Sequence, residues 1–210
     1  MNNFLIAKES FSFLAGSGLL ALLLYLVNPW ASLLPGVFFL FCLFFFRNPK
    51  REVIPDAKAA LSPADGIIMG VTKMQDPEHM DGEVWKVTIF LSILNVHFNR
   101  TPVDGIVESI NYVPGKFFPA FKSHASGLNE RNYVVFNTQF GRIMVCQITG
   151  FIARRIVCWA KKGDSFRQGE RFGLIKFGSC TEIYLPLRYL VLVKKGDRVK
   201  AGLSVIGRIN

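Results

Sequence analysis

Few side chains of this protein can carry protons near neutral pH, because it has only three histidines. His79 and His124 each stand in a polar stretch, which predicts solvated loop positions. His97 follows an apolar run, and its neighbours alternate between apolar and hydrogen-bonding types. A histidine at the end of a buried strand either satisfies a structural hydrogen bond or acts as a general acid or base. The residues alone leave both interpretations of His97 open.

Two aspartates are candidate partners for His97. Asp65 and Asp104 occupy matching places in two copies of a Pro-x-Asp-Gly-Ile motif, which begin at residues 63 and 102. An Asp followed by Gly is typical of a turn that the Asp side chain caps. This structural role explains both residues, and the motif does not choose between them.

Candidate nucleophiles are equally few. The Gly178-Ser179 pair interrupts an apolar strand, a pattern that by itself predicts a β-bulge. The four cysteines, Cys42, Cys146, Cys158 and Cys180, form no Cys-x-x-Cys pair and are predicted to be small buried hydrophobic residues. No cluster of histidine, cysteine and aspartate has the spacing of metal ligands, so no metal is expected.

The elements that position these residues begin with an apolar N-terminal segment. The 37 residues between Glu9 and Arg47 carry no charge. One continuous helix of that length would measure about 55 Å, against about 30 Å of bilayer hydrocarbon. Prolines divide the segment into two apolar pieces, Phe11 to Val27 and Pro35 to Phe46. The pattern predicts a membrane helical hairpin over residues 1–46.

Basic residues flank this hairpin and set its expected orientation. Lys8 precedes it, and Arg47, Lys50 and Arg51 follow it, which predicts that both ends face the cytoplasm at the cell membrane. The whole chain carries 25 Lys and Arg against 15 Asp and Glu, a formal charge of +10. Such a charge favours an acidic partner, and next to a hairpin it favours an anionic lipid surface over nucleic acid.

Residues 47–210 are predicted to form a mostly β domain. Short β-branched runs alternate with Gly, Pro and Asp, as is typical of antiparallel sheets. No glycine-rich nucleotide-binding motif is present. A second repeat, Lys-Lys-Gly-Asp-x4-Gly, begins at residues 161 and 194, and we expect it to form tight hairpins between short strands. Paired units of this kind are found in lipoyl-like folds, so we expect a duplicated barrel-sandwich domain.

The ordered motifs of the chain resemble the short, prokaryotic type of phosphatidylserine decarboxylase. Any one of them is weak, but seven in the family's order, over nearly the whole length, are specific. They are Phe-Phe-Arg-Asn-Pro-Lys-Arg (residues 45–51), Ser-Pro-Ala-Asp-Gly (62–66), Leu-Asn-Val-His-Phe-Asn-Arg-Thr-Pro-Val-Asp-Gly (94–105), Pro-Gly-Lys-Phe (114–117), Asn-Glu-Arg-Asn (129–132), Ala-Arg-Arg-Ile-Val (153–157) and Gly-Glu-Arg-Phe-Gly-Leu-Ile-Lys-Phe-Gly-Ser (169–179).

This resemblance implies a proenzyme that cuts itself between Gly178 and Ser179. The products are a chain of residues 1–178 and a chain of residues 179–210, which form a heterodimer. Ser179 becomes a covalent pyruvoyl group, the only cofactor expected. In the family an Asp-His pair activates the serine, and the matching positions here are Asp65 and His97.

The resemblance also implies the reaction. The pyruvoyl carbonyl forms a Schiff base with the amine of phosphatidylserine, CO₂ leaves, and the product is phosphatidylethanolamine of the phospholipid biosynthetic route. His97 is the candidate proton donor. Two positions depart from the family pattern: Cys180, whose thiol can compete for acyl transfer, and His124, where Lys is more common.

Three alternatives remain at this point. A membrane-bound serine hydrolase would use Ser179, His97 and Asp65 without cutting the chain. A membrane-anchored module would only bind a partner. A decarboxylase of a related lipid, such as archaetidylserine, would use the same chemistry on another substrate.

Overall fold

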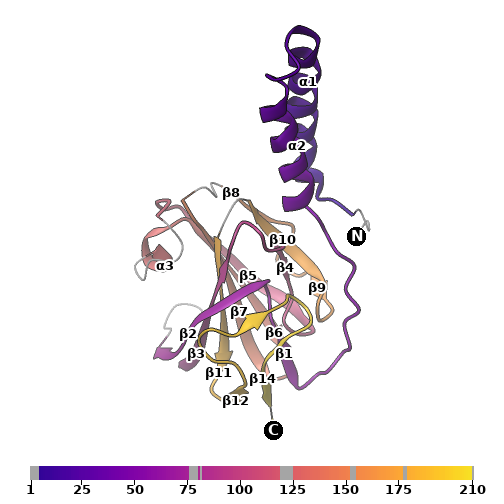
Figure 1. Cartoon of the computed structure of the whole chain (residues 1–210). Helices are drawn as coiled ribbons and strands as arrows, with labels where there is room; N and C mark the ends of the chain where they lie inside the picture. Colours follow the sequence, from indigo (N-terminus) through magenta and orange to yellow (C-terminus); the bar gives the residue numbers. More distant parts are fainter. Residues whose placement is uncertain are drawn as a thin grey trace. The chain divides into compact units, whose positions relative to one another are not determined.

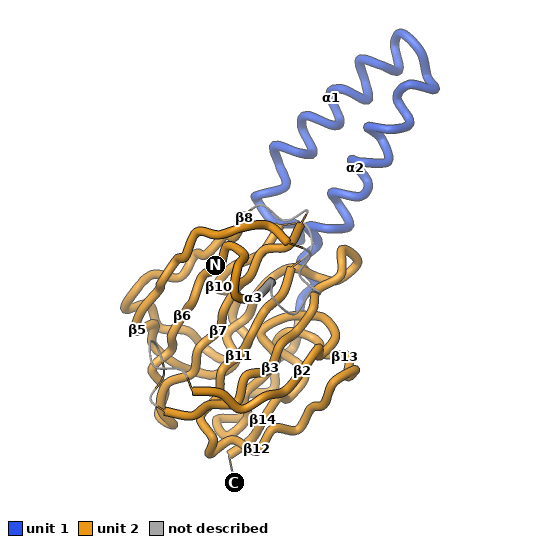
Figure 2. Tube along the Cα trace, turned by 90° about the vertical axis from the view of Figure 1, so that its left-hand side faces the viewer, with its two compact units in different colours: residues 1–50 blue, residues 51–210 orange. Residues whose placement is uncertain are grey.

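The computed structural model of the 210-residue chain describes residues 5–75, 80, 82–118, 125–151, 155–176 and 179–209. The chain divides into two compact units, residues 1–50 and residues 51–210 (Figures 1 and 2). The first unit is helical, and the second consists almost entirely of β-structure.

Two apolar helices make up most of the first unit. A single 3-10 turn, η1 (Lys8–Ser10), leads into α1 (Phe11–Val27), and α2 (Leu33–Phe45) lies beside α1 (Figure 2). The start predicted for the second helix is two residues late, because Pro35 lies inside its first turn. Proline is tolerated there, since the first N–H groups of a helix have no partner within it.

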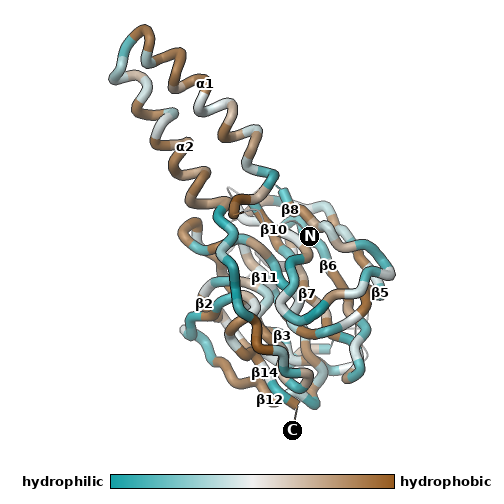
Figure 3. The backbone as a smooth tube through the Cα atoms, turned by 90° about the vertical axis from the view of Figure 1, so that its right-hand side faces the viewer, coloured by the Kyte–Doolittle hydropathy of each residue, from teal (hydrophilic) through white to brown (hydrophobic). Residues whose placement is uncertain are grey.

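The surface of α1 is mostly apolar. Leu22, Leu23 and Leu26 are exposed, and Figure 3 shows the hydrophobic colouring along both helices. Among the described residues, one helical segment, Lys8–Val27, has the length and composition to cross a membrane, and α2 is shorter. These features favour membrane association of the first unit. They do not test the predicted hairpin in a membrane, which stays a prediction.

The second unit has fourteen strands and one short helix among the described residues. They are β1 (Ala59–Leu61), β2 (Gly66–Gln75), β3 (Glu83–Leu91), β4 (Phe98–Arg100), β5 (Gly105–Val113), α3 (Ala125–Leu128), β6 (Arg131–Thr138), β7 (Gly141–Thr149), β8 (Arg155–Cys158), β9 (Ser165–Phe166), β10 (Arg171–Lys176), β11 (Ser179–Pro186), β12 (Tyr189–Val191), β13 (Arg198–Val199) and β14 (Val205–Ile209). The mostly β class predicted from the sequence is confirmed.

These strands form three antiparallel sheets. A curled eight-stranded sheet has the order β13-β2-β3-β11-β7-β6-β5-β9 (Figure 1). Two three-stranded sheets have the orders β1-β14-β12 and β4-β10-β8. A large apolar core packs on one face of the eight-stranded sheet and includes Ile89, Leu91, Ile143 and Ile183. This face also carries the polar residues described below.

The strand order is duplicated. Each end of the eight-stranded sheet has a two-residue strand, β13 or β9, paired with the strand that follows a Pro-x-Asp-Gly motif, β2 or β5. The two halves meet at the centre, where β11 pairs with β7. Each half also has its own three-stranded sheet, so the sequence repeats correspond to a repeated architecture.

The two Lys-Lys-Gly-Asp turns make the same backbone contacts. Gly163 and Gly196 have φ angles of 91° and 96°, a left-handed conformation that favours glycine. Their N–H groups donate to the carbonyls of Val107 and Ile68, each at 2.8 Å. The expectation of tight hairpins at these turns is wrong. The strands that follow pair with β5 and β2, which are remote in sequence.

The second half of the fold is inserted into the first. β3 ends at Leu91 and β11 begins at Ser179, and these two residues are register partners. The chain between them builds β4 to β10 and returns to the same place. The two joints of this insertion, at Leu91 and Ser179, therefore lie side by side.

Candidate active site

Ser179 begins β11 at one of these joints. Its neighbours in register are Leu91 on β3 and Thr149 on β7. The residue is fully buried, and its hydroxyl oxygen has no hydrogen-bond partner among the described residues. A buried hydroxyl without a partner is rare and costs about 1–3 kcal/mol. The fold therefore keeps a buried, unpaired hydroxyl at the start of β11, a central strand of the eight-stranded sheet.

A cluster of buried polar side chains lies on the same face as Ser179. Side chains two residues apart in a strand share a face, so Thr181 lies on the face of Ser179, and Gln147 lies opposite it on β7. Asn99 on β4 donates to the Thr181 hydroxyl at 3.0 Å and accepts from the Gln147 amide at 2.9 Å. This end of the core is polar, unlike the rest of the face.

His97 lies just before β4 and is 2% exposed. Its carbonyl accepts a hydrogen bond from the Ile175 N–H at 3.2 Å, which attaches it to β10, the strand that leads to Ser179. Its Nδ1 lies 3.0 Å from the carbonyl oxygen of Asn95. A carbonyl only accepts, so this contact assigns the proton to Nδ1, and in the neutral ring the lone pair is on Nε2.

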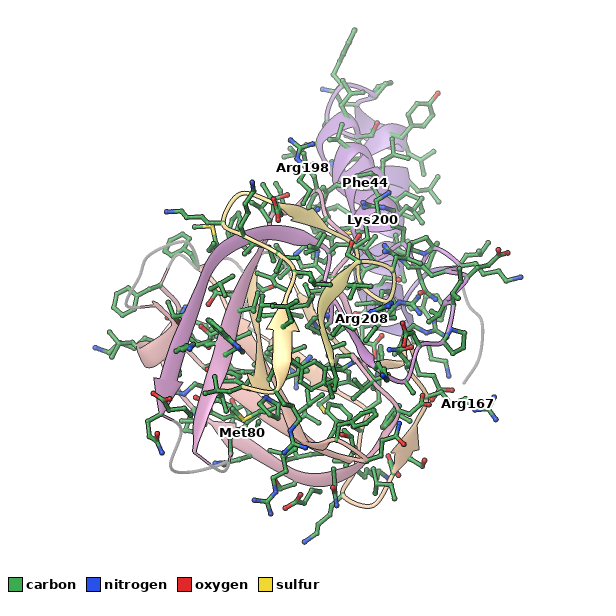
Figure 4. All side chains as sticks on the ribbon, turned by 90° about the horizontal axis from the view of Figure 1, so that it is seen from below. Phe44, Met80, Arg167, Arg198, Lys200 and Arg208 are labelled. Atoms are coloured by element: carbon green, nitrogen blue, oxygen red, sulfur yellow. The ribbon has the colours of Figure 1, made fainter. Side chains whose placement is uncertain are left out.

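Asp65 and Asp104 make equivalent hydrogen bonds, but each accepts a backbone N–H from a residue remote in the sequence and not, as the motif predicts, from its own turn. Asp65 Oδ1 accepts from the Ala201 N–H at 2.8 Å, and Asp104 Oδ1 accepts from the Gln168 N–H at 2.6 Å. Asp104 is exposed, whereas Asp65 is buried and its Oδ2 forms an ion pair with Arg51 at 2.8 Å. Lys200 and Arg167 directly precede the two residues whose N–H groups donate to these aspartates. Their side chains lie well apart in Figure 4.

Arginine side chains surround Asp65. Arg51 also donates to the carbonyl of Ala201 at 3.1 Å, and Arg100 donates to the carbonyl of Gly169 at 2.8 Å. Burial, and secondarily the charges of Arg51 and Arg171, lower the pKa of Arg100 to about 10, while the charge of Asp65 opposes the shift. Asp65 therefore lies in a positive environment, in direct contact with the Arg51 guanidinium.

The Asp65 turn and Ser179 are linked through β4. The carbonyl of Pro63, two residues before Asp65, accepts from the Arg100 N–H at 2.9 Å. Asn99, beside Arg100, bonds Thr181 on β11. No hydrogen bond joins Asp65 to His97 among the described residues, so the structure connects the two residues through β4.

A sequence model of the family described as phosphatidylserine decarboxylase matches residues 38–207. The chain belongs to the phosphatidylserine decarboxylase family. It is therefore an enzyme, a decarboxylase of the lyase class.

Relatives of this family match almost the whole chain. A phosphatidylserine decarboxylase proenzyme of Carboxydothermus hydrogenoformans is 52% identical over 203 residues, which cover 96% of this chain and 95% of the relative. Proenzymes of the same name from Symbiobacterium thermophilum and Syntrophus aciditrophicus are 44% identical over 208 residues and 42% identical over 205 residues. Those matches cover 98% and 96% of this chain, and 96% of each relative.

Three residues of the sequence prediction lie outside the described residues: Gly178, His79 and His124. The peptide bond expected to be cut, from the family resemblance, joins Gly178 to Ser179. The structure describes only the Ser179 side of that bond. The described histidine is His97, whose carbonyl is bonded to Ile175 of β10. Among the described residues no group of acidic, histidine and cysteine side chains has the arrangement of a metal site.

Cys180 does not share the environment of Ser179. It follows Ser179 in β11 and therefore faces the opposite side of the sheet, where it packs in a cluster with Cys146 and Tyr184. Burial, and secondarily the charge of Glu182, raises the pKa of the Cys180 thiol well above its ordinary value. The thiol stays protonated, which makes competition with Ser179 for acyl transfer unfavourable.

Sequence analysis missed the roles of four residues near the site. Arg51 was interpreted as a membrane-facing charge, but its guanidinium is buried against Asp65. Asn99, Gln147 and Thr181 form the polar network and carry no signal of their own, since amides and hydroxyls are common in strands of this kind. Asn99 lies in the motif around His97, and that is the only signal that pointed toward it.

Proposed function

We propose that this chain is a self-cutting proenzyme that decarboxylates phosphatidylserine to phosphatidylethanolamine. The cut falls between Gly178 and Ser179 and converts Ser179 into a pyruvoyl group. The observation that carries this proposal is the fully buried Ser179 hydroxyl, which lacks a partner among the described residues of a chain in this family.

The chemistry of the cut begins at the Ser179 hydroxyl. Its oxygen attacks the carbonyl carbon of Gly178, a base takes the hydroxyl proton, and the peptide C–N bond breaks to give an ester and a free amine. Loss of the Ser179 Cα proton then expels the Gly178 carboxylate and leaves dehydroalanine. Water hydrolyses the dehydroalanine, ammonia leaves, and the new chain of 32 residues begins with a ketone.

The residues around Ser179 suit such a group. The site is buried, polar on the face of Thr181 and Thr149, and flanked by strands on both sides. A pyruvoyl carbonyl condenses with a substrate amine and takes up the electron pair released when CO₂ leaves. The protein contributes position and the exclusion of water, which strengthens electrostatic interactions in the site.

His97 is the proposed proton carrier. With its proton held on Nδ1 by the Asn95 carbonyl, its Nε2 accepts the proton of Ser179 during the cut and later delivers one to the carbon that lost CO₂. Asp65 is proposed as the family's partner acid. Its contacts in the structure support an indirect role, in which it acts through β4, the strand that directly follows His97.

We also propose the cellular setting. The apolar residues 1–46 attach the protein to the cell membrane with residues 47–210 on the cytoplasmic face, close to the phospholipid. The net charge of +10 favours an anionic lipid surface, and Arg or Lys side chains bind the substrate phosphate. No nucleic acid is involved.

The intact mass of the purified protein tests the proposal. We expect two chains, with the smaller one beginning at residue 179, blocked at its amino end and lacking the mass of ammonia. Ser179→Ala is expected to stay uncut and inactive. A single full-length chain in active material contradicts the proposal, and reaction of that chain with serine-directed phosphonates would instead indicate a hydrolase. Assays with archaetidylserine and phosphatidylserine separate the two lipid substrates.

A further inference from the structure

We propose that Asn99, Gln147 and Thr181 are positioning residues that hold the new amino end of the short chain after the cut. The inference rests on the proposed function, because it concerns the form in which residue 179 is a chain terminus. It assigns a role to a buried network that neither the cutting chemistry nor the family resemblance requires.

The hydrogen bonds of this network have a fixed direction. The Gln147 amide nitrogen lies 3.4 Å from the Val157 carbonyl, which can only accept, so this atom is the donor. Gln147 therefore donates to Asn99 Oδ1 at 2.9 Å, and the nitrogen of Asn99 donates to the Thr181 hydroxyl at 3.0 Å. Asn132 completes the chain by donating to Gln147 Oε1 at 3.0 Å.

Every member of the network is almost completely inaccessible to water. Asn99, Gln147 and Thr181 are 0% exposed, and Asn132 is 3% exposed. Water cannot replace a lost bond at these positions, so removal of one partner leaves a buried polar group unpaired. The loss of one side chain is therefore expected to disturb the whole network.

The cut creates a chain terminus that this network can hold in place. In the uncut chain, Ser179 is held by covalent bonds on both sides and by the pairing of β11 with β3 and β7. After the cut, residue 179 is a terminus, and chain termini fray unless they are tied down. Thr181 is then the third residue of the short chain, while Asn99 and Gln147 belong to the long chain.

The network therefore joins the two chains through side chains within one β-pleat of the reactive residue. Thr181 and residue 179 share a face of β11, so a displacement of Thr181 is transmitted directly to the reactive end. A displacement of about 1 Å at a reacting group is enough to cost about a hundredfold in rate. The network is thus expected to affect the cut enzyme more than the cutting reaction.

The experiment compares Thr181→Val, Thr181→Ser and Thr88→Val with the wild-type full-length chain. Thr88 is a matched control, because its hydroxyl also bonds a β11 side chain, Glu182 at 3.2 Å, but lies on the opposite face of the sheet. Two measurements are made on the cut enzyme. These are hydrogen–deuterium exchange of the first residues of the short chain, and kcat and KM with phosphatidylserine.

We expect Thr181→Val to be cut, to exchange these amides about tenfold faster, and to lose about tenfold or more in kcat with little change in KM. Thr181→Ser and Thr88→Val are expected to behave like the wild type. Four results would each overturn the inference. Thr181→Val could exchange these amides at the wild-type rate, or could fail to be cut. Thr88→Val could lose as much kcat as Thr181→Val, or Thr181→Ser could fail to restore the wild-type exchange rate. Failure of the proposed function appears separately, as an uncut wild-type chain.

Discussion

Asp65 and Asp104 show how one residue of a repeated pair departs from its counterpart. Both accept a backbone N–H from a residue remote in the sequence, so both have a structural role in the fold. Asp65 alone of the two has its second oxygen in an ion pair with Arg51 and is buried. The duplication thus provides an internal control for any role of the Asp65 charge.

Replacement of each aspartate by asparagine tests that role. Asparagine keeps the side-chain oxygen that accepts the backbone N–H, and it replaces the second, charged oxygen, which in Asp65 accepts from Arg51, with a neutral NH₂ group. We expect Asp65→Asn to slow the cut by about a hundredfold or more, and Asp104→Asn to be cut normally. The measurement is the fraction of cut chain against time by mass spectrometry, with circular dichroism to verify folding. A folded Asp65→Asn that is cut at the wild-type rate removes Asp65 from the mechanism.

The ring of His97 is oriented by a local contact with Asn95, and its backbone is attached to β10. If Nε2 moves the protons, His97→Ala should lower the rate of cutting, of decarboxylation, or of both by about 10²–10⁴-fold. The cut fraction is measured by mass and the second step by release of CO₂. A His97→Ala protein that performs both steps normally shows that another group carries the proton.

Among the strands, β10 depends on close contact with its neighbours. Gly173 pairs with Cys158 on β8, and a Cβ at Gly173 would lie 2.8 Å from the Gln147 amide nitrogen and against the Val157 carbonyl. The strand can pack over the polar network only because this position has no side chain.

Gly173→Ala is therefore expected to destabilise the protein by about 1–3 kcal/mol and to disturb the network. The matched control is Gly70→Ala, since a Cβ at Gly70 would meet no atom within 4 Å. Urea unfolding of both variants measures the difference in the free energy of unfolding. Equal stability of the two variants would show that β10 can shift to make room.

Over the whole second unit, the insertion of one half into the other determines where the site lies. The stretch that carries His97 leaves the first half after β3, and the chain returns at Ser179, the register partner of Leu91. The site thus occupies the place where the two crossings between halves meet. A cut at this place leaves the paired strands of both halves intact.

We therefore expect the two chains to stay together after the cut. The short chain contributes β11, which pairs with β3 and β7, and also β13 and β14, which pair with β2 and β1. Size-exclusion chromatography in mild detergent should show one species with both chains, which separate only in denaturant. Dissociation of the short chain under native conditions would contradict this arrangement of strands.

Much of the architecture follows from the sequence by itself. The apolar, uncharged run predicts α1 as Phe11–Val27, the limits that the structure has, because the first proline of the run, Pro29, follows directly after this segment and Asn28. The β-branched runs predict the long strands. The repeated motifs predict the duplication, because the same Pro-x-Asp-Gly residues precede β2 and β5.

Other features depend on contacts between residues far apart in the chain, which only the tertiary structure decides. Strands of two or three residues, such as β9 and β13, form only because remote partners complete them. The ion pair of Arg51 with Asp65 and the network from Gln147 to Thr181 join segments that no local pattern relates. The physical reason is that turn and helix preferences act over a few residues, whereas burial and strand pairing act across the whole fold.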